Sequence, residues 1–398
     1  MSPSGQLRTI RQANIRTIIE ALTAHEAMSR AELCRVTGLS RTTMHRILRD
    51  LVAEKVVVEH VPDVRSAPGR PEGLLSVNPD AGVVVGLELG RSHIAAVLLN
   101  YAGGVVCGED LRLENPLGWD VALDILLEML DRLLERQARG GCALKLGLVG
   151  LHGLMPSSVN YPGSDERDRR VGQLRSTLTE RLGVPVEIHS NARLAAVAEF
   201  RGLALSGENL VYCHLSRGIG AAIIIGGQVL SGSSNSAGEF GHMRLVPDGE
   251  PCHCGSTGCV ETVVGLDSLM RSARAIEPGL RDFDHLCESV PGSEPIQQLA
   301  STTAVALGNA IGNMCNVVNP AYVVLGGELV GLLPDWVEQV GVGVGQTALP
   351  QVREGLHLSA SIHGQRAAAQ GAGLLALDMV LGRVQNNEGE TAIEQARP

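Results

Sequence analysis

A cluster of metal-binding residue types lies in the second half of the chain. Cys252, Cys254 and Cys259 fall within eight residues, and His242 precedes them by ten. Three thiolates and one imidazole are a common ligand set for a closed, structural zinc site. His253 is the rival fourth ligand, but between two ligating cysteines the chain can hardly turn its side chain onto the same ion. The spacing therefore predicts one structural Zn²⁺, and a disulfide, which would leave one thiol over, is the alternative.

The N-terminal residues 1–62 show the pattern of a helix-turn-helix domain. Ser29 and Glu32 form a capping-box pair at the start of a helix expected over residues 30–37, and Gly38 ends that helix. Ser40 caps a second helix, expected from residue 41 to about residue 54. Its core face is predicted to be Met44, Ile47, Leu48 and Leu51.

The opposite face of the second helix is rich in groups that recognise DNA. Such side chains can contact base edges and phosphates in a major groove. The alternative is a solvated surface of an ordinary three-helix bundle. The predicted DNA-binding residues are Arg41, Thr42, Thr43, His45, Arg46 and Arg49.

Residues 63–80 are predicted to form a wing and a linker. Two short alternating segments, 56–59 and 74–77, are expected as its strands. Between them Arg70 follows Gly69 and precedes Pro71, and prolines keep such a backbone extended. An arginine on this backbone fits a narrow A·T minor groove, although a plain linker would also be rich in Pro and Gly.

Charge and composition agree with a DNA-binding head on a small-molecule-binding body. Residues 1–70 carry 11 Lys and Arg against 7 Asp and Glu, whereas the whole chain has a net charge of −10. The nine cysteines, with no secretion signal before them, indicate a cytoplasmic protein with reduced thiols. Apolar runs are far shorter than the roughly 20 residues that cross a membrane, so no membrane partner is expected.

The body contains an internal repeat. Residues 88–99 align with residues 214–225, and both segments are apolar runs with a central break that lead into a Gly-Gly pair. Each is expected to be a β-hairpin that opens an α/β lobe, and helical patterns follow over residues 121–137 and 295–318. The expected lobes are residues 81–190, completed by a C-terminal helix over residues 366–382, and residues 191–365, which include the metal motif.

Three segments of the chain resemble the ROK family of sugar kinases and sugar-responsive repressors. They are residues 186–199 around Asn191, the Gly-His and Cys-x-Cys-Gly-x-x-Gly-Cys-x-Glu motif of residues 241–261, and the head with its Gly69-Arg70-Pro71. The resemblance implies an actin-like fold of two lobes with a winged helix-turn-helix in front. In the family's kinases an aspartate at position 191 removes the proton from the sugar hydroxyl. An amide there can bind a sugar but cannot act as the base.

The resemblance also implies which residues touch a sugar and which departures exclude ATP. Two glycine-rich turns hold nucleotide phosphates in the kinases. Here Arg91 and Arg217 stand at glycine positions of those turns, and Glu88 replaces an aspartate. Bulky side chains are expected to fill the nucleotide site, so no ATP is expected. Position by position, the sugar-binding residues are Gly153, Ser190, Asn191, Glu239, His242 and Glu261.

We therefore predict a regulator and not an enzyme. It is expected to bind operator DNA as a homodimer or dimer of dimers, and to repress genes of carbohydrate metabolism in response to a sugar. The alternatives are an active ATP-dependent sugar kinase with an added DNA-binding head, and a zinc-stabilised scaffold without a ligand.

Overall fold

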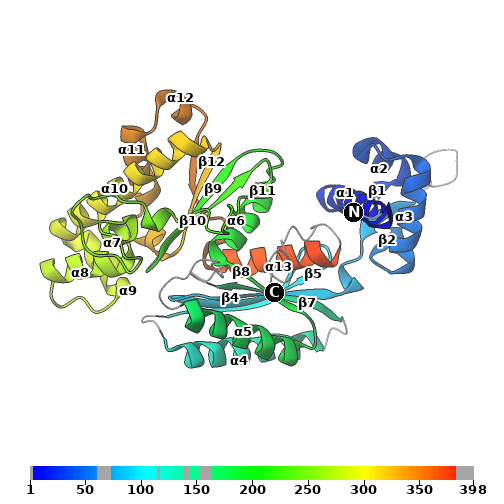
Figure 1. The fold of residues 1–398 in the computed structure, drawn as a ribbon, viewed down its shortest axis with the longest axis horizontal. Coiled ribbons are helices and arrows are strands. Elements are labelled where there is room, and N and C mark those ends of the chain that lie inside the picture. The colour runs from blue at the N-terminus through cyan, green and yellow to red at the C-terminus, as the bar shows by residue number, and fades with distance from the viewer. Residues whose placement is uncertain (1–2, 61–72, 114–116, 139–142, 152–163, 382–398) are drawn as a thin grey trace, which may run out of the picture.

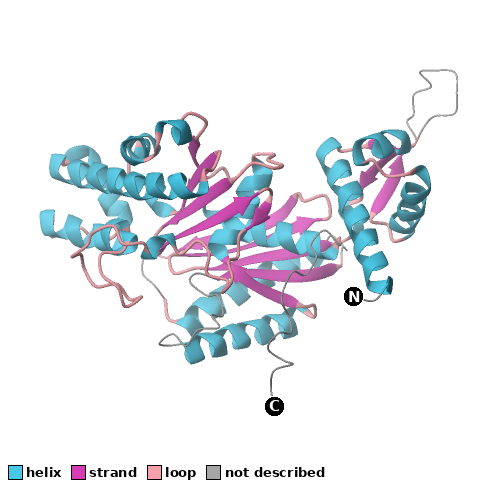
Figure 2. Ribbon diagram, turned by 45° about the horizontal axis from the view of Figure 1, so that its top comes forward, coloured by secondary structure: helices cyan, strands magenta, loops and turns pink. Residues whose placement is uncertain are grey.

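The computed structural model describes residues 3–60, 73–113, 117–138, 143–151 and 164–381. The N-terminal head packs three helices against a small antiparallel sheet in the order β1-β3-β2. Both views show this head set apart from the rest of the chain (Figures 1 and 2). Its elements are α1 (Pro3–His25), β1 (Met28–Ser29), α2 (Arg30–Thr37), α3 (Arg41–Ala53), β2 (Val57–His60) and β3 (Leu74–Val77).

Local capping explains where the head's helices begin and end. The Ser29 hydroxyl accepts from the Glu32 N–H, and the Glu32 carboxylate accepts from the Ser29 N–H at 2.9 Å. Gly38 ends α2 with φ of 69°, a left-handed conformation that glycine adopts without strain. The Ser40 hydroxyl accepts from the Thr43 N–H at the start of α3. The predicted bounds of α2, and of α3 to within one residue, are confirmed.

Lobe 1 is a five-stranded mixed sheet in the order β6-β5-β4-β7-β8. Helices α4 and α5 cover one face, and the distant helix α13 lies on the other (Figure 1). The strands are β4 (Val83–Leu89), β5 (His93–Asn100), β6 (Val105–Arg112), β7 (Leu144–Leu151) and β8 (Val186–Ser190), and the helices are α4 (Trp119–Ala138), α5 (Ser164–Leu182) and α13 (Ala367–Val380).

Lobe 2 repeats this plan with a sheet in the order β11-β10-β9-β12-β13. Its strands are β9 (Leu210–Leu215), β10 (Ile219–Ile225), β11 (Gln228–Val229), β12 (Tyr322–Gly326) and β13 (His357–Ala360). Its helices are α6 (Asn191–Gly202), α7 (Val260–Val264), α8 (Leu266–Ile276), α9 (Phe283–Ser289), α10 (Glu294–Val318), α11 (Trp336–Thr347) and α12 (Pro350–Arg353). The short 3-10 helices of the described chain, of which η1 precedes lobe 1, are η1 (Pro79–Ala81), η2 (Phe240–His242), η3 (Val290–Gly292), η4 (Glu328–Gly331) and η5 (Gly364–Arg366).

The predicted repeat corresponds to the antiparallel hairpins β4–β5 and β9–β10, one in each lobe. Helices α6 and α13 pack together between the two sheets (Figure 1). A Cβ added at Gly371 would lie 1.7 Å from the Leu194 carbonyl oxygen, so only glycine allows this approach. The division of the body at residues 190 and 191 remains a prediction, because α6 contacts both α13 and strand β9.

Candidate metal and ligand site

The four predicted metal ligands lie together at the end of η2 and in the loop that leads from it to α7. One ligand atom from each of His242, Cys252, Cys254 and Cys259 lies within 4.8 Å of every other. Glycines let the loop close on itself, because Gly258 has φ of 66° and packs against the Val246 carbonyl. Cys252 and Cys259 are buried, whereas Cys254 is partly exposed.

The distances between these donors suit a tetrahedral zinc ion. With Zn–S bonds of about 2.3 Å, two sulfurs of a tetrahedron lie about 3.8 Å apart, and Cys254 Sγ and Cys259 Sγ are separated by 3.7 Å. His242 Nδ1 lies 3.5 Å from Cys252 Sγ. Desolvation and the neighbouring thiols raise the pKa of Cys259 to about 12, so its thiolate needs a cation beside it. The donor set therefore fits Zn²⁺.

His253 has a different partner. Its Nδ1 lies 3.2 Å from Glu261 Oε1 and 3.9 Å from Cys252 Sγ. Cys252, His253 and Glu261 also form a second group within metal-binding distance of one another. The four-ligand cluster is the more complete of the two, and it leaves His253 available to hold Glu261.

Two predicted sugar-binding carboxylates adjoin the metal cluster. His242 Nε2 lies 3.9 Å from Glu239 Oε2, on the side of the ring opposite the cysteines. Glu261 Oε2 accepts from the Ile219 N–H at 2.9 Å. The Glu239 side chain is 63 % exposed and that of Glu261 is 13 % exposed. One imidazole therefore joins a metal site to a group that can bind hydroxyls.

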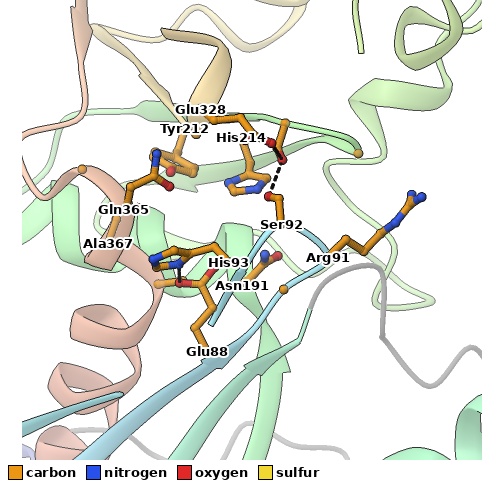
Figure 3. A pocket seen from close by; sticks show the side chains of 16 residues that line it. Glu88, Arg91, Ser92, His93, Asn191, Tyr212, His214, Glu328, Gln365 and Ala367 are labelled. Carbon is orange, nitrogen blue, oxygen red and sulfur yellow. Dashed lines mark hydrogen bonds and ion pairs between the residues drawn. The ribbon is translucent and has the colours of Figure 1, made fainter. Parts of the chain in front are cut away.

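Ser190 and Asn191 lie where β8 ends and α6 begins. Asn191 is buried, and its Oδ1 accepts from the Ala192 N–H at 2.8 Å. Asn191 lines an interlobe cavity (Figure 3). The Ser190 side chain makes no capping hydrogen bond to α6. Gly153 lies outside the described residues.

The interlobe cavity is narrow and polar. It measures about 20 Å³, which is room for about one water molecule. Across it, Ser92 Oγ of lobe 1 lies 2.8 Å from Ser216 Oγ of lobe 2, which donates to Glu328 at 2.8 Å. Figure 3 shows Glu88 and His93 beneath Tyr212 and His214. In this conformation the cavity has no room for a nucleotide.

The two arginines in the hairpin turns meet one carboxylate. Arg217 forms an ion pair with Asp267 of α8, and Arg91 Nη2 lies 3.8 Å from the same side chain. Asp267 thus links the turn of lobe 1 to the turn of lobe 2. Asp267 is not among the residues predicted from the sequence, because nothing in the sequence around it marks a contact with either turn.

A buried arginine holds the loop that leads to Glu239. Arg193 donates to the carbonyls of Ser231, Asn235 and Ala237 and to the Asn235 side chain. Burial lowers the pKa of Arg193, although the nearby Glu239 opposes the shift. Arg193 therefore ties the start of α6 to the loop of residues 231–237.

His93 lies between two carboxylates. Its Nδ1 is 3.5 Å from Glu88 Oε2 and its Nε2 is 3.7 Å from Asp110 Oδ2. Burial lowers the pKa of His93, but Glu88 and Asp110 outweigh burial and leave that pKa raised. Glu88 thus faces a histidine whose pKa is raised in the fold.

The predicted DNA-binding face of α3 is open. Met44, Ile47, Leu48 and Leu51 are buried, as predicted. The exposed residues are Arg41, Thr42, His45, Arg46 and Arg49, with Thr43 partly exposed. Arg49 Nη2 lies 3.2 Å from Asp50. Arg70 lies outside the described residues, whereas the wing strands β2 and β3 pair as expected.

Known proteins resemble the chain over most of its length. The ROK family profile matches residues 84–379, and the profile of the IclR helix-turn-helix domain matches residues 15–60. The xylose repressor of Bacillus spizizenii is 26 % identical over 385 residues, which covers 94 % of this chain and 97 % of that protein.

Two solved structures are similar in fold, the first over nearly the whole chain and the second over three quarters of it. A ROK family transcriptional regulator, a homolog of the E. coli Mlc protein, matches with a TM-score of 0.75 and 22 % identity over 94 % of this chain and 98 % of its own. A ROK hexokinase from Thermus thermophilus matches with a TM-score of 0.60 and 28 % identity over 75 % of this chain and 99 % of its own.

A winged helix-turn-helix joined to two actin-like α/β lobes defines a class of two-part proteins, with a DNA-binding head and a small-molecule-binding body. Within that class, the chain belongs to the ROK family. The predicted fold is confirmed. None of the described helices is long and apolar enough to span a membrane.

Proposed function

We propose that the chain is a sugar-responsive transcriptional regulator that represses genes of carbohydrate metabolism. The observation that carries the proposal is the open cationic face of α3 on the same chain as a ROK body. Three arginines and a histidine on one exposed helix face suit a major groove. The similarity to repressors over nearly the full chain supports the same function.

The proposed regulator acts in the cytoplasm as a homodimer or dimer of dimers. Two copies of α3 then read two half-sites of an operator, since a symmetric dimer matches a palindromic site. Arg41, Thr42, Thr43, His45, Arg46 and Arg49 contact the major groove, and Arg70 enters the minor groove.

The proposed effector binds between the lobes and is not phosphorylated. Glu239, His242 and Glu261 accept or donate hydrogen bonds to ring hydroxyls, and Asn191, Ser190 and Gly153 complete the site. Asn191 is an amide with no basic oxygen, so it does not take a proton from a hydroxyl near neutral pH. The sugar changes DNA binding because it favours one arrangement of the lobes over another.

A zinc ion would be held by His242 Nδ1 and the thiolates of Cys252, Cys254 and Cys259. It would supply folding energy to the loop and fix the His242 ring so that Nε2 faces Glu239. The role is structural, because four protein ligands leave no open coordination position.

The test starts by selecting an operator from random duplex DNA with the full-length protein. Fluorescence anisotropy then measures the affinity for that duplex with and without each of several monosaccharides. We expect one sugar to change the affinity at least about fivefold. We expect Arg46→Ala to weaken binding at least about tenfold, and the body variant Arg175→Ala to leave it unchanged. A failure to enrich any sequence would contradict the proposal.

The alternative, an ATP-dependent sugar kinase with a DNA-binding head, has support in the likeness to the hexokinase. It predicts ADP release in the presence of a sugar. Arg91 and Arg217 in the turns, and the amide of Asn191, argue against it. A coupled ADP assay across the same monosaccharides decides between the two functions.

A further inference from the structure

Four carboxylates surround the proposed sugar site and the cavity beside it. Glu239 adjoins His242 and Glu261 adjoins His253, while Glu88 and Glu328 line the cavity with Asn191. Glu88 is 3 % exposed and Glu328 is 8 % exposed. Like charges repel strongly where water is excluded, so an anionic ligand needs a cation to meet it there.

The arginines in the two turns already have an anionic partner. Arg217 and Arg91 share the Asp267 carboxylate. Figure 3 shows the Arg91 side chain directed away from Glu88 and His93 in the cavity. Asp267 therefore occupies the place that a phosphate would need between two guanidinium groups.

The other arginines near the cavity are engaged as well. Arg193 donates to the carbonyls of residues 231–237, and Arg112 pairs with Asp284 and lies 3.5 Å from Glu328. Breaking the first set leaves loop carbonyls without their donor, and moving Arg112 takes a cation away from the buried Glu328; both changes are unfavourable.

The Arg217 turn lies directly beside the proposed sugar-binding carboxylate. Ile219, two residues after Arg217, donates its N–H to Glu261. Leu266, which precedes Asp267, donates its N–H to the Ser216 carbonyl at 3.1 Å. A substituent on a sugar held by Glu261 would therefore lie near Arg217, whose charge is balanced by Asp267.

The cavity also restricts what a bound sugar can carry. Its volume is about 20 Å³, close to that of a single water site. A phosphate group, with about −1.5 to −2 charge at pH 7, would have to fit there beside Glu88 and Glu328.

We propose that the site takes an uncharged sugar and rejects the matching sugar phosphate, and that Asp267 sets this preference by neutralising Arg91 and Arg217. The inference rests on the proposed function and adds the chemical class of its effector.

Calorimetric titration of the full-length protein with matched ligand pairs tests the preference. The pairs are glucose with glucose 6-phosphate and N-acetylglucosamine with its 6-phosphate; xylose is added as a further uncharged sugar. For each pair in which the uncharged sugar binds, we expect its 6-phosphate to bind at least about tenfold more weakly. A phosphate that binds as tightly as its uncharged partner, or more tightly, overturns the inference and leaves the proposed function standing.

A different outcome separates the two claims. If no sugar and no sugar phosphate binds, and none changes DNA affinity, the proposed function fails and the inference fails with it. If a sugar phosphate binds tightly, the inference is wrong, and a cation outside the two turns, such as the exposed Arg244, binds the phosphate group.

Two variants test the role of Asp267 itself. Asp267→Asn releases Arg91 and Arg217 from their anionic partner, so we expect the ratio of phosphate to sugar affinity to rise at least about fivefold. Asp131→Asn removes the acidic partner of Arg181, which joins α4 to α5 away from the cavity, and is the matched control, for which we expect no rise. Melting curves confirm that both variants fold. An unchanged ratio in Asp267→Asn overturns the role assigned to Asp267.

Discussion

The two sides of the interlobe region both have polar side chains but arrange them differently. On the zinc-loop side, residues 239–261, Glu239 is largely exposed and His242 Nε2 has only a distant carboxylate beside it. On the hairpin-turn side, residues 88–93 and 215–219, the polar groups meet one another. Ser92 contacts Ser216, Glu88 faces His93, and both arginines face Asp267.

This difference separates a region with polar groups open to a ligand from one whose polar groups already have partners. A binding site needs groups whose hydrogen bonds are left for the ligand, together with a rigid support for them. The zinc loop has both. In the hairpin turns the polar groups contact one another across the lobes, so fewer of their hydrogen bonds are left for a ligand.

Removal of the metal should break the zinc-loop side and have the largest effect. We expect Cys254→Ser to lose the ion and to lower the free energy of unfolding by more than about 4 kcal/mol, because loss of a structural metal is among the most destabilising changes. Elemental analysis and urea unfolding measure the two quantities. Cys107→Ser, which is outside the cluster, is the control. An unchanged unfolding curve would show that no metal supports this loop.

Loss of the Arg193 side chain should loosen the same side without touching the metal. Arg193→Ala leaves three loop carbonyls without their donor, and we expect the free energy of unfolding to fall by about 2–3 kcal/mol. Limited proteolysis should then cut within residues 231–237. Arg193→Lys keeps the charge but not the forked donor geometry, so it should restore only part of the stability. Equal stability of all three proteins would contradict this role.

The hairpin-turn side can be probed through pH. The pKa of His93 is raised in the fold by Glu88 and Asp110, so the ion pairs contribute fully below the unfolded-state value of about 6.5. That contribution is lost as the pH rises through the raised folded-state pKa. The stability difference between the wild type and His93→Gln should therefore shrink from pH 5.5 to pH 8.5, as measured by urea unfolding at each pH. A stability difference that stays constant over this pH range would contradict the ion pairs assigned to a protonated His93.

A carboxylate at position 191 should not by itself restore nucleotide binding at the hairpin-turn side. We expect Asn191→Asp to show no ATP-dependent phosphorylation of any sugar, because Arg91, Arg217 and Asp267 still close the turns. The coupled ADP assay checks this, with a ROK sugar kinase as positive control. Measurable turnover by the single variant would show that the turns still accept a nucleotide.

Local sequence signals predicted the parts of the fold that local physics decides. Ser29, Glu32 and Gly38 mark the ends of α2 through backbone hydrogen bonds within a few residues. Apolar runs with a central break predicted both hairpins, and the cysteine spacing predicted that the four possible ligands form one group.

Contacts between the lobes could not be predicted in this way. Ser92 and Ser216 are 124 residues apart in the sequence, and their contact depends on how the two hairpins face each other. The same holds for Asp267, which lies on a helix of ordinary amphipathic pattern. The roles of Gly153, Ser190, Asn191, Glu239 and Glu261 toward a sugar remain predictions, as do the contacts of Arg70 with DNA.

The position of α13 has a consequence for the order in which the chain folds on the ribosome. Val84, Ala95 and Val97 of lobe 1 are buried in clusters that include residues of α13. During synthesis these strands emerge on the order of tens of seconds before that helix does. The strands of lobe 2 are all complete earlier, since β13 ends at Ala360. The strands of the first lobe therefore have an apolar face that stays uncovered until α13 has been translated.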